Sequence, residues 1–198
     1  MKLNKFAKAI SYIFDGSYIS IPVYLTINIF MLKTVKEVAI WTSLCVLFGS
    51  IVPFAFVVFL YKKKIINDLH VPRREDRLKP LIVSNISYLL GFFIFYIFKA
   101  PVYLRAIFFT SFLTTFILTI ITYFWKISFH TSWITFTSIT YYVLFGKWTL
   151  FLLLFVPLVA WARVKIKRHT VTQVLSGSFL TLVTTLFGYS FFGLFNMF

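Results

Sequence analysis

The stretch WARVKIKRHTVTQVLSG, residues Trp161–Gly177, separates two long apolar runs of the chain. It is strongly basic and carries one histidine, His169. Five residues separate Arg163 from this histidine, and three separate the histidine from Gln173. Apolar runs joined by a short basic segment are typical of membrane-spanning helices with a loop at the membrane surface. The same alternation extends through the rest of the chain.

The composition indicates a membrane protein. Of 198 residues, 60% are hydrophobic, 22% aromatic and only 13% charged, whereas about 25% of residues in soluble domains are charged. Several apolar runs reach the length of about 17–25 residues that a helix needs to cross a bilayer. The longest polar segment, Lys62–Pro80, is too short to be a sizeable soluble domain. These features predict an all-α, polytopic transmembrane helical bundle that forms a single domain over residues 1–198.

Seven membrane spans are expected. They are about Ser17–Leu32, Val38–Tyr61, Leu81–Phe98, Ala106–Trp125, Thr131–Gly146, Trp148–Ala162 and Val171–Phe195. The fifth and sixth spans are short and are separated only by Gly146 and Lys147. This predicts a tight helical hairpin; a single re-entrant pair is the alternative. Pro53 and Pro157 lie inside spans, where bilayer helices tolerate proline.

Seven crossings place three polar segments on one membrane face. These segments, Lys62–Pro80, Lys126–His130 and Arg163–Thr170, follow the second, fourth and sixth spans. An even number of crossings separates them from one another, and the N-terminus lies on the same side. This face carries fifteen of the twenty lysines and arginines. The positive-inside rule therefore predicts that it is cytoplasmic.

The charge pattern narrows the expected partners. In a soluble protein, the formal net charge of +15 would suggest nucleic acid. Here the cations lie in short loops beside apolar spans, so membrane lipids and their phosphates are expected, and nucleic acid is not. No acidic residue follows Asp76. Two of the three loops thus lack carboxylates, and no metal site is expected. A transporter would carry polar residues at mid-span, where only serine and threonine are evident.

Each of the three histidines lies in a different loop of the same face. They are His70, His130 and His169, each with an arginine or lysine within a few residues. A phosphate monoester dianion is held by cations and hydrogen-bond donors, and the planar fork of arginine suits this task. One histidine can take the phosphoryl group as a nucleophile, and a second can protonate the leaving group. The loops therefore favour phosphoryl transfer at the membrane surface.

The spacing around His169 predicts its local geometry. On a helix, His169 and Gln173 would share one face, about 6 Å apart along the axis. The Gln173 carbonyl oxygen could then hold one ring N–H and leave the other ring nitrogen free to attack. Arg163 and His169 would be about 120° out of phase on one continuous helix. They can converge only if the helix breaks between them, so we predict that break, with the last helix starting near Thr170.

These residues resemble three motifs of the type-2 phosphatidic acid phosphatase superfamily. Arg163, His169 and position 173 have the spacing of the third motif, which reads Ser-Arg, five residues, His, three residues, Asp. The segment Ile-Ser-Phe-His at residues 127–130 resembles the second motif, Pro-Ser-Gly-His. Residues 73–80, RREDRLKP, resemble a divergent first motif, which normally reads Lys, six residues, Arg-Pro. The order of the segments and their placement on one face match as well.

The resemblance implies both a fold and an activity. The fold would be a six-helix core, here about residues 38–198, with the first span added. The activity would be phosphoester hydrolysis without a metal or other cofactor. His169 would be the nucleophile that forms a phosphohistidine, His130 the general acid, and Arg163 and Ser128 phosphate ligands. In the first and second segments, we expect further phosphate-binding cations, which are Arg74, Arg77, Lys79 and Lys126.

The chain also departs from the family pattern. Ala162 replaces the serine of the third motif, and Gln173 replaces its aspartate. Glutamine can orient an imidazole ring but cannot stabilise imidazolium by charge. Ile127 and Phe129 replace the proline and glycine of the second motif. The sequence therefore predicts hydrolysis of a phosphate or diphosphate on a lipid, and the alternative is a non-catalytic lipid-phosphate-binding member of the same fold.

Overall fold

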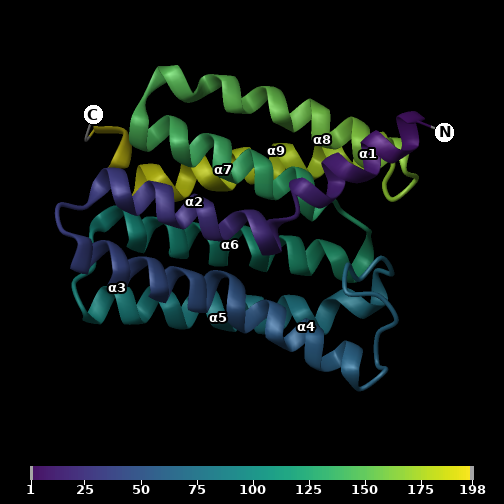
Figure 1. Cartoon of the computed structure of the whole chain (residues 1–198), viewed down its shortest axis with the longest axis horizontal. Coiled ribbons are helices and arrows are strands. Elements are labelled where there is room, and N and C mark those ends of the chain that lie inside the picture. Colours follow the sequence, from purple (N-terminus) through teal and green to yellow (C-terminus); the bar gives the residue numbers. More distant parts are fainter. Residues whose placement is uncertain (1, 197–198) are drawn as a thin grey trace. The chain divides into compact units, whose positions relative to one another are not determined.

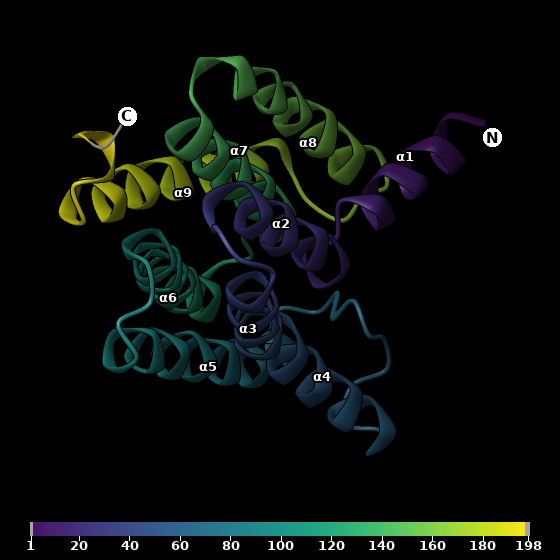
Figure 2. The same ribbon diagram turned by 60° about the vertical axis from the view of Figure 1, so that its left-hand side comes forward.

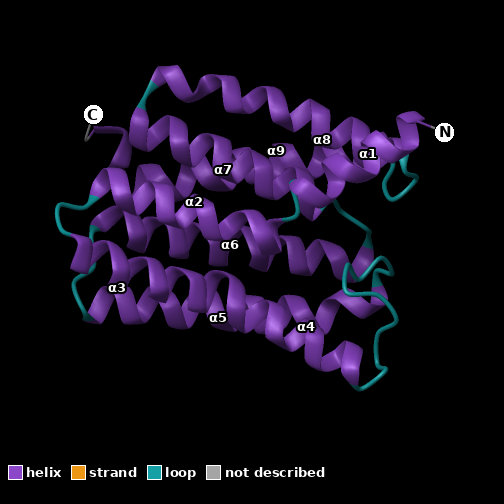
Figure 3. Cartoon of the chain, in the orientation of Figure 1, coloured by secondary structure: helices purple, strands orange, loops and turns teal. Residues whose placement is uncertain are grey.

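The computed structural model describes residues 2–196, and all regular secondary structure in that range is helical (Figures 1 and 3). This confirms the all-α prediction. In chain order the helices are α1 (Lys2–Ile13), α2 (Gly16–Met31), α3 (Val35–Val46), η1 (Leu47–Ile51), α4 (Val52–Lys62), η2 (Glu75–Arg77), α5 (Leu78–Ile97), α6 (Val102–Phe124), α7 (Phe129–Phe145), η3 (Lys147–Leu154), α8 (Phe155–Lys165), α9 (Val171–Phe191) and η4 (Leu194–Asn196).

Several of these helices are suited to cross a membrane. Five helical segments among the described residues are long and apolar enough, and α1 with α2 would be a sixth if the bent pair is one span. The five are Val35–Lys62, Glu75–Ile97, Val102–Phe124, Lys147–Lys165 and Val171–Phe191. Each of the seven predicted spans corresponds to a helix, although α7, in the fifth, has only 17 residues. The helices therefore support a multi-pass membrane protein.

Helix α1 precedes the first predicted span and is not among the helices that the sequence predicts. The lysines at positions 2, 5 and 8 make this segment look polar. On a helix, residues three and four positions apart share a face. Ala7, Ile10 and Ser11 have this spacing and are all buried. The helix is therefore amphipathic, and one side of it belongs to the protein interior.

The contacts between Cα atoms divide the chain into two compact units. Unit 1 combines the N-terminal residues up to Ile19 with the residues from Lys126 onward, and unit 2 comprises Ser20–Trp125. Unit 1 thus contains α1 and the helices from α7 to η4, and unit 2 contains most of α2 and the helices from α3 to α6 (Figure 2).

In unit 2, the π-helix η1 interrupts the long α3–α4 segment just before Pro53. The N–H of Val52 donates to the carbonyl of Leu47, five residues earlier. The next residue, Pro53, has no N–H to give to Phe48. The hydroxyl of Ser87 on α5 donates to this Phe48 carbonyl instead, at 2.6 Å. The helix break is thus satisfied by a neighbouring helix, as a membrane interior requires.

Unit 2 also buries asparagines that the sequence reading passed over. That reading found only serine and threonine at mid-span, and this was incomplete. The fully buried Asn28 donates to the hydroxyl of Thr42 at 3.0 Å and accepts from the hydroxyl of Tyr103 at 2.9 Å. Asn85 donates to the hydroxyl of Thr119 at 2.9 Å. Uncharged polar groups of this kind join helices inside membranes.

In unit 1, α7 and the segment η3–α8 form the predicted tight hairpin. Gly146 alone separates the two helices, and its φ of +90° favours glycine because a side chain would be strained there. Pro157 lies in the first turn of α8, where a missing N–H is tolerated. Helix α9 packs along α7. The two helices therefore form the predicted hairpin.

Helix α1 packs against α8 in unit 1. Their contact is an apolar cluster of buried residues, which are Ala7, Ile10, Ile134, Val159 and Ala162. Ala162 is the residue that replaces the serine of the third motif, and it is completely buried there. The small side chain at this position therefore belongs to the surface on which α1 packs.

Candidate functional site

The predicted break between Arg163 and His169 is confirmed. Helix α8 ends at Lys165, and α9 begins after its N-cap, Thr170. Between them Lys167 has a φ of +58°, in the left-handed region. The backbone N–H groups of Arg168 and His169 both donate to the carbonyl of Arg163, at 3.0 and 3.3 Å. The turn therefore folds the chain back, and His169 lies beside the end of α8.

Gln173 contacts the imidazole of His169 as the spacing predicted. Its Oε1 atom lies 3.0 Å from Nδ1 of the ring. The same Oε1 accepts from the backbone N–H of Thr170 at 3.3 Å, as part of a capping box at the start of α9. A backbone N–H can only donate, so the atom it meets must be the carbonyl oxygen of the amide. In the neutral imidazole, Nδ1 then carries the hydrogen that bonds to that oxygen, and Nε2 of His169 carries the lone pair.

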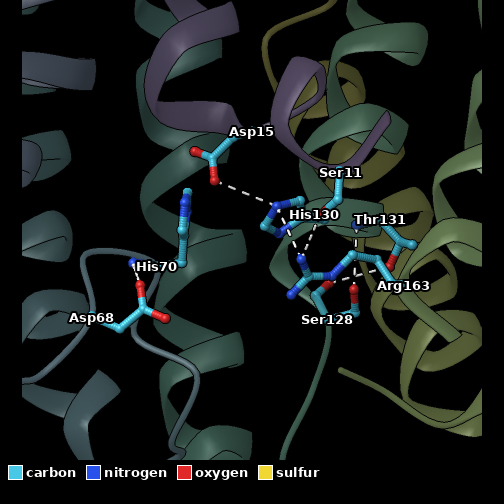
Figure 4. Close-up of polar contacts among 8 residues, drawn as sticks. All are labelled: Ser11, Asp15, Asp68, His70, Ser128, His130, Thr131 and Arg163. Atoms are coloured by element: carbon cyan, nitrogen blue, oxygen red, sulfur yellow. Dashed lines mark hydrogen bonds and ion pairs between the residues drawn. The ribbon is translucent and has the colours of Figure 1, made fainter. Parts of the chain in front are cut away.

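The side chains of Asp15 and Arg163 both approach His130, at the start of α7, and Ser11 contacts Arg163 (Figure 4). Nε2 of His130 lies 3.5 Å from Nη1 of Arg163 and 3.4 Å from Oδ2 of Asp15. Nη1 of Arg163 also donates to the hydroxyl of Ser11 at 2.6 Å. Arg163 and Asp15 are both buried, with 7% and 8% of their surfaces exposed. A guanidinium and a carboxylate thus approach the same imidazole nitrogen.

Asp15 and Ser11 were not among the predicted site residues. The structure brings the carboxylate of Asp15 to His130, not to the Gln173 position. One signal was present: Asp15 is the only acidic residue before Glu37 and stands between two apolar segments.

The second and third motif segments are joined by hydrogen bonds between α7 and α9. The backbone N–H of Ser128 donates to the carbonyl of Gln173 at 3.3 Å. Further along, the hydroxyl of Thr131 donates to the carbonyl of Val174 at 3.0 Å. These bonds fix the start of α7 against the start of α9. Because His130 contacts Arg163 as well, the segments that carry both candidate catalytic histidines lie at the same end of unit 1.

Gly177 makes this close approach possible. A Cβ atom at position 177 would lie 2.6 Å from the carbonyl oxygen of Ser128 and 3.1 Å from the hydroxyls of Thr131 and Ser132. The hydroxyl of Ser132 donates to the carbonyl of Gly177 at 3.1 Å. A larger residue would therefore push the start of α7 away from α9.

Ser128 and Lys126, two further predicted phosphate ligands of unit 1, differ in their burial. Ser128 is completely buried, and its hydroxyl caps α7 by accepting from the backbone N–H of Thr131 at 3.4 Å. A hydroxyl that accepts one hydrogen bond can still donate its own hydrogen. Lys126 is half-buried and lies two residues before Ser128.

The predicted phosphate-binding residues of the first segment belong to unit 2 and have separate anchors there. Nη1 of Arg74 donates to the carbonyl of Phe124 at 2.6 Å, and its Nε lies 3.4 Å from the carboxylate of Glu75. Arg77 is buried and donates through Nε to the carbonyl of Val71 at 2.9 Å. Lys79 is exposed. Arg77 thus holds the preceding loop, whereas Arg74 lines a cavity of about 340 Å³.

His70, the third loop histidine, also lies in unit 2. Its backbone N–H donates to the carboxylate of Asp68 at 2.9 Å (Figure 4). Across residues 2–196, no three side chains of His, Cys, Asp or Glu gather closely enough to hold a metal ion.

Comparisons with protein-family models, with curated proteins and with solved structures find no match to the chain. The family resemblance therefore rests on the residues and spacings of the three motif segments.

Proposed function

We propose that this protein is an integral-membrane lipid phosphate or diphosphate phosphatase, a divergent member of the type-2 phosphatidic acid phosphatase superfamily. One observation carries the proposal. At a single end of unit 1, Arg163 contacts His130, while Gln173 holds Nδ1 of His169 and leaves the lone pair on Nε2. Phosphoryl transfer without a metal requires a cation that binds the phosphate, a general acid and a nucleophile.

In the first chemical step, Nε2 of His169 attacks the phosphorus atom. The bond between phosphorus and the oxygen of the lipid leaving group breaks, and that oxygen takes a proton from His130. Arg163 stabilises the negative charge on the remaining phosphoryl oxygens. We assign the hydroxyl of Ser128 and Lys126 to the same anion, and the motif resemblance gives phosphate-binding roles to Arg74, Arg77 and Lys79 of the first segment.

In the second step, water attacks the phosphorus of the phosphohistidine. The water proton passes to His130, the bond between phosphorus and nitrogen breaks, and inorganic phosphate leaves. Both histidines then return to their starting states, so the cycle needs no metal and no other cofactor. The substrate enters laterally from the bilayer into a six-helix core formed by the second to seventh spans, with its phosphate on the cytoplasmic face.

The rival function is binding of a lipid phosphate without hydrolysis, and Gln173 favours it. In the first chemical step, the His169 ring gains positive charge as it forms the bond to phosphorus. The amide of Gln173 cannot neutralise that charge as a carboxylate would. The phosphorylated state would then be poorly stabilised. The lipid phosphate would still meet Arg163, so binding could survive where turnover fails.

Phosphate release from lipids tests the proposal directly. The purified protein is given phosphatidic acid or a polyprenyl diphosphate in detergent with EDTA, and inorganic phosphate is measured. We expect release by the wild type, a fall of at least about 10³-fold in His169→Ala, and a fall of about 10²–10⁴-fold in His130→Ala. His70→Ala is the histidine control outside the motif segments and keeps its activity. A ³²P-labelled substrate should leave alkali-stable label on wild type and none on His169→Ala.

The outcomes separate the two functions. Binding of every lipid without phosphate release by the wild type would establish the rival. If the protein is a phosphatase, Gln173→Asp should preserve or raise activity, because the carboxylate adds charge stabilisation while keeping an acceptor for the ring. Complete loss of activity in this variant would show that the orienting role assigned to Gln173 is wrong. Labelling of single cysteines in the loops of intact cells would report the face of the site.

A further inference from the structure

We infer that Asp15 is a positioning residue for the general acid His130, a role that rests on the proposed phosphatase function. The carboxylate comes from the connection between α1 and α2, outside the three motif segments. Its Oδ2 lies 3.4 Å from Nε2 of the imidazole (Figure 4). The resemblance to the phosphatase motifs assigns no residue in this region.

The need for a carboxylate follows from the position of Arg163. A general acid must hold its proton before the reaction begins. The guanidinium of Arg163 is permanently charged and lies 3.5 Å from the same ring nitrogen of His130. Two cations at this distance repel each other, and burial strengthens the repulsion. The carboxylate of Asp15 offsets it and so favours the protonated imidazole.

The two partners of Nε2 also suit the two states of the ring. When Nε2 carries a hydrogen, it can donate to the carboxylate of Asp15. When Nε2 is unprotonated, it can accept from Nη1 of Arg163. Each protonation state of His130 therefore has a hydrogen-bond partner of the correct kind. A residue that gives up a proton in the first step and regains it in the second requires such a setting.

Helix α1 fixes the position of both partners. Ser11, near the end of this helix, accepts from Nη1 of Arg163 at 2.6 Å. Ala7 and Ile10 anchor the helix to α8 in a buried apolar cluster with Ala162. Asp15 follows directly, and its backbone carbonyl accepts from the N–H groups that begin α2. Replacing Asp15 with asparagine leaves that backbone role and the side-chain shape almost unchanged while removing the charge.

The dependence of the rate on the leaving group distinguishes positioning of an acid from a structural role. An alkyl alcohol leaves poorly unless it is protonated, whereas p-nitrophenolate leaves without help. We expect Asp15→Asn to lower hydrolysis of phosphatidic acid by about 10²-fold, the lower limit for general acid catalysis. Hydrolysis of p-nitrophenyl phosphate should stay close to the wild-type rate. Asp15→Glu restores the charge and should recover part of the lost activity.

The control and the possible outcomes keep this inference separate from the proposed function. Glu37→Gln removes one negative charge from an exposed capping box in unit 2, and both of its rates should match wild type. Wild-type protein inactive on both substrates would refute the phosphatase itself. An active wild type with equal losses on both substrates in Asp15→Asn, in protein that elutes and melts normally, would overturn the positioning role. A faster Asp15→Asn enzyme would also overturn it, because the carboxylate would then be occupying the phosphate site.

Discussion

Two clusters of buried polar side chains, the Asn28 network of unit 2 and the His130 cluster of unit 1, differ in charge. In unit 2, Asn28 bonds to the hydroxyls of Thr42 and Tyr103, and all three groups are neutral. In unit 1, the imidazole of His130 lies between a buried carboxylate and a buried guanidinium. Neutral groups that satisfy one another join helices at little cost. Buried charges are expensive unless they are paired.

This difference separates stability from function. A structural role is enough to explain the neutral network of unit 2, because its donors and acceptors hold α2, α3 and α6 together. A core of apolar residues could pack unit 1 without any charge, and a buried ion pair contributes little to stability compared with such packing. The charged cluster is therefore the part of the molecule for which chemistry is the better explanation. Substitutions in the two units should accordingly affect different properties.

Among the substitutions that compare the two units, replacement of Arg163 should have the largest effect on phosphate release. Arg163→Gln removes the cation that we propose binds phosphate beside His130, and we expect phosphate release to fall by about 10²–10³-fold, as for the loss of one transition-state donor. Lys165→Gln is the matched control, because Lys165 lies two residues away on the same helix but is exposed. Its activity should stay near wild type. Equal losses in the two variants would mean that the cations act only through the general positive charge of this segment.

A methyl group at Gly177 should have an intermediate effect that distinguishes the units. Gly177→Ala places a Cβ 2.6 Å from the carbonyl of Ser128, and Gly91→Ala in unit 2 places one 2.6 Å from the ring of Phe108. Both changes overpack an interface and should lower the free energy of unfolding by about 1–3 kcal/mol. Only the first displaces the proposed catalytic segments, so only Gly177→Ala should also lower the activity per folded protein, by about 10²-fold.

Thermal melting in detergent and phosphate release from monodisperse protein measure the two quantities separately. The comparison between the units would fail if Gly91→Ala lost as much specific activity as Gly177→Ala. It would also fail if Gly177→Ala were unstable but fully active once folded, because the bonds between α7 and α9 would then not position the histidines.

Most helices could be predicted from the sequence because each apolar run is long and bounded by basic or turn residues. The break after Arg163 was predictable as well, since the two functional residues could not otherwise share a site. Helix α1 was not, because three lysines on one side of it concealed a buried side formed by Ala7, Ile10 and Ser11. A search for apolar residues spaced three and four positions apart, rather than for long apolar runs, would have found this helix.

The site was predictable where its residues are close in the sequence. The contact between His169 and Gln173 follows from helical spacing alone. The contacts of Arg163 with Ser11 and of His130 with Asp15 join residues 152 and 115 positions apart. Such pairs depend on how helices pack, which a single sequence does not encode locally. The same limit applied to Arg77, whose bond to the carbonyl of Val71 depends on the fold of a loop.

Removing a hydroxyl from the neutral network should have the smallest effect. Tyr103→Phe deletes the donor to Asn28 and leaves its carbonyl oxygen without that bond. Side-chain hydrogen bonds inside membrane proteins contribute about 0.6 kcal/mol on average and up to about 1.7 kcal/mol. We therefore expect a slightly lower melting temperature and unchanged phosphate release, with Tyr96→Phe, at an exposed position of the same unit, as the control. If Tyr103→Phe instead abolished activity without altering stability, the buried network of unit 2 would take part in function. The absence of charge in a buried cluster would then no longer indicate a purely structural role.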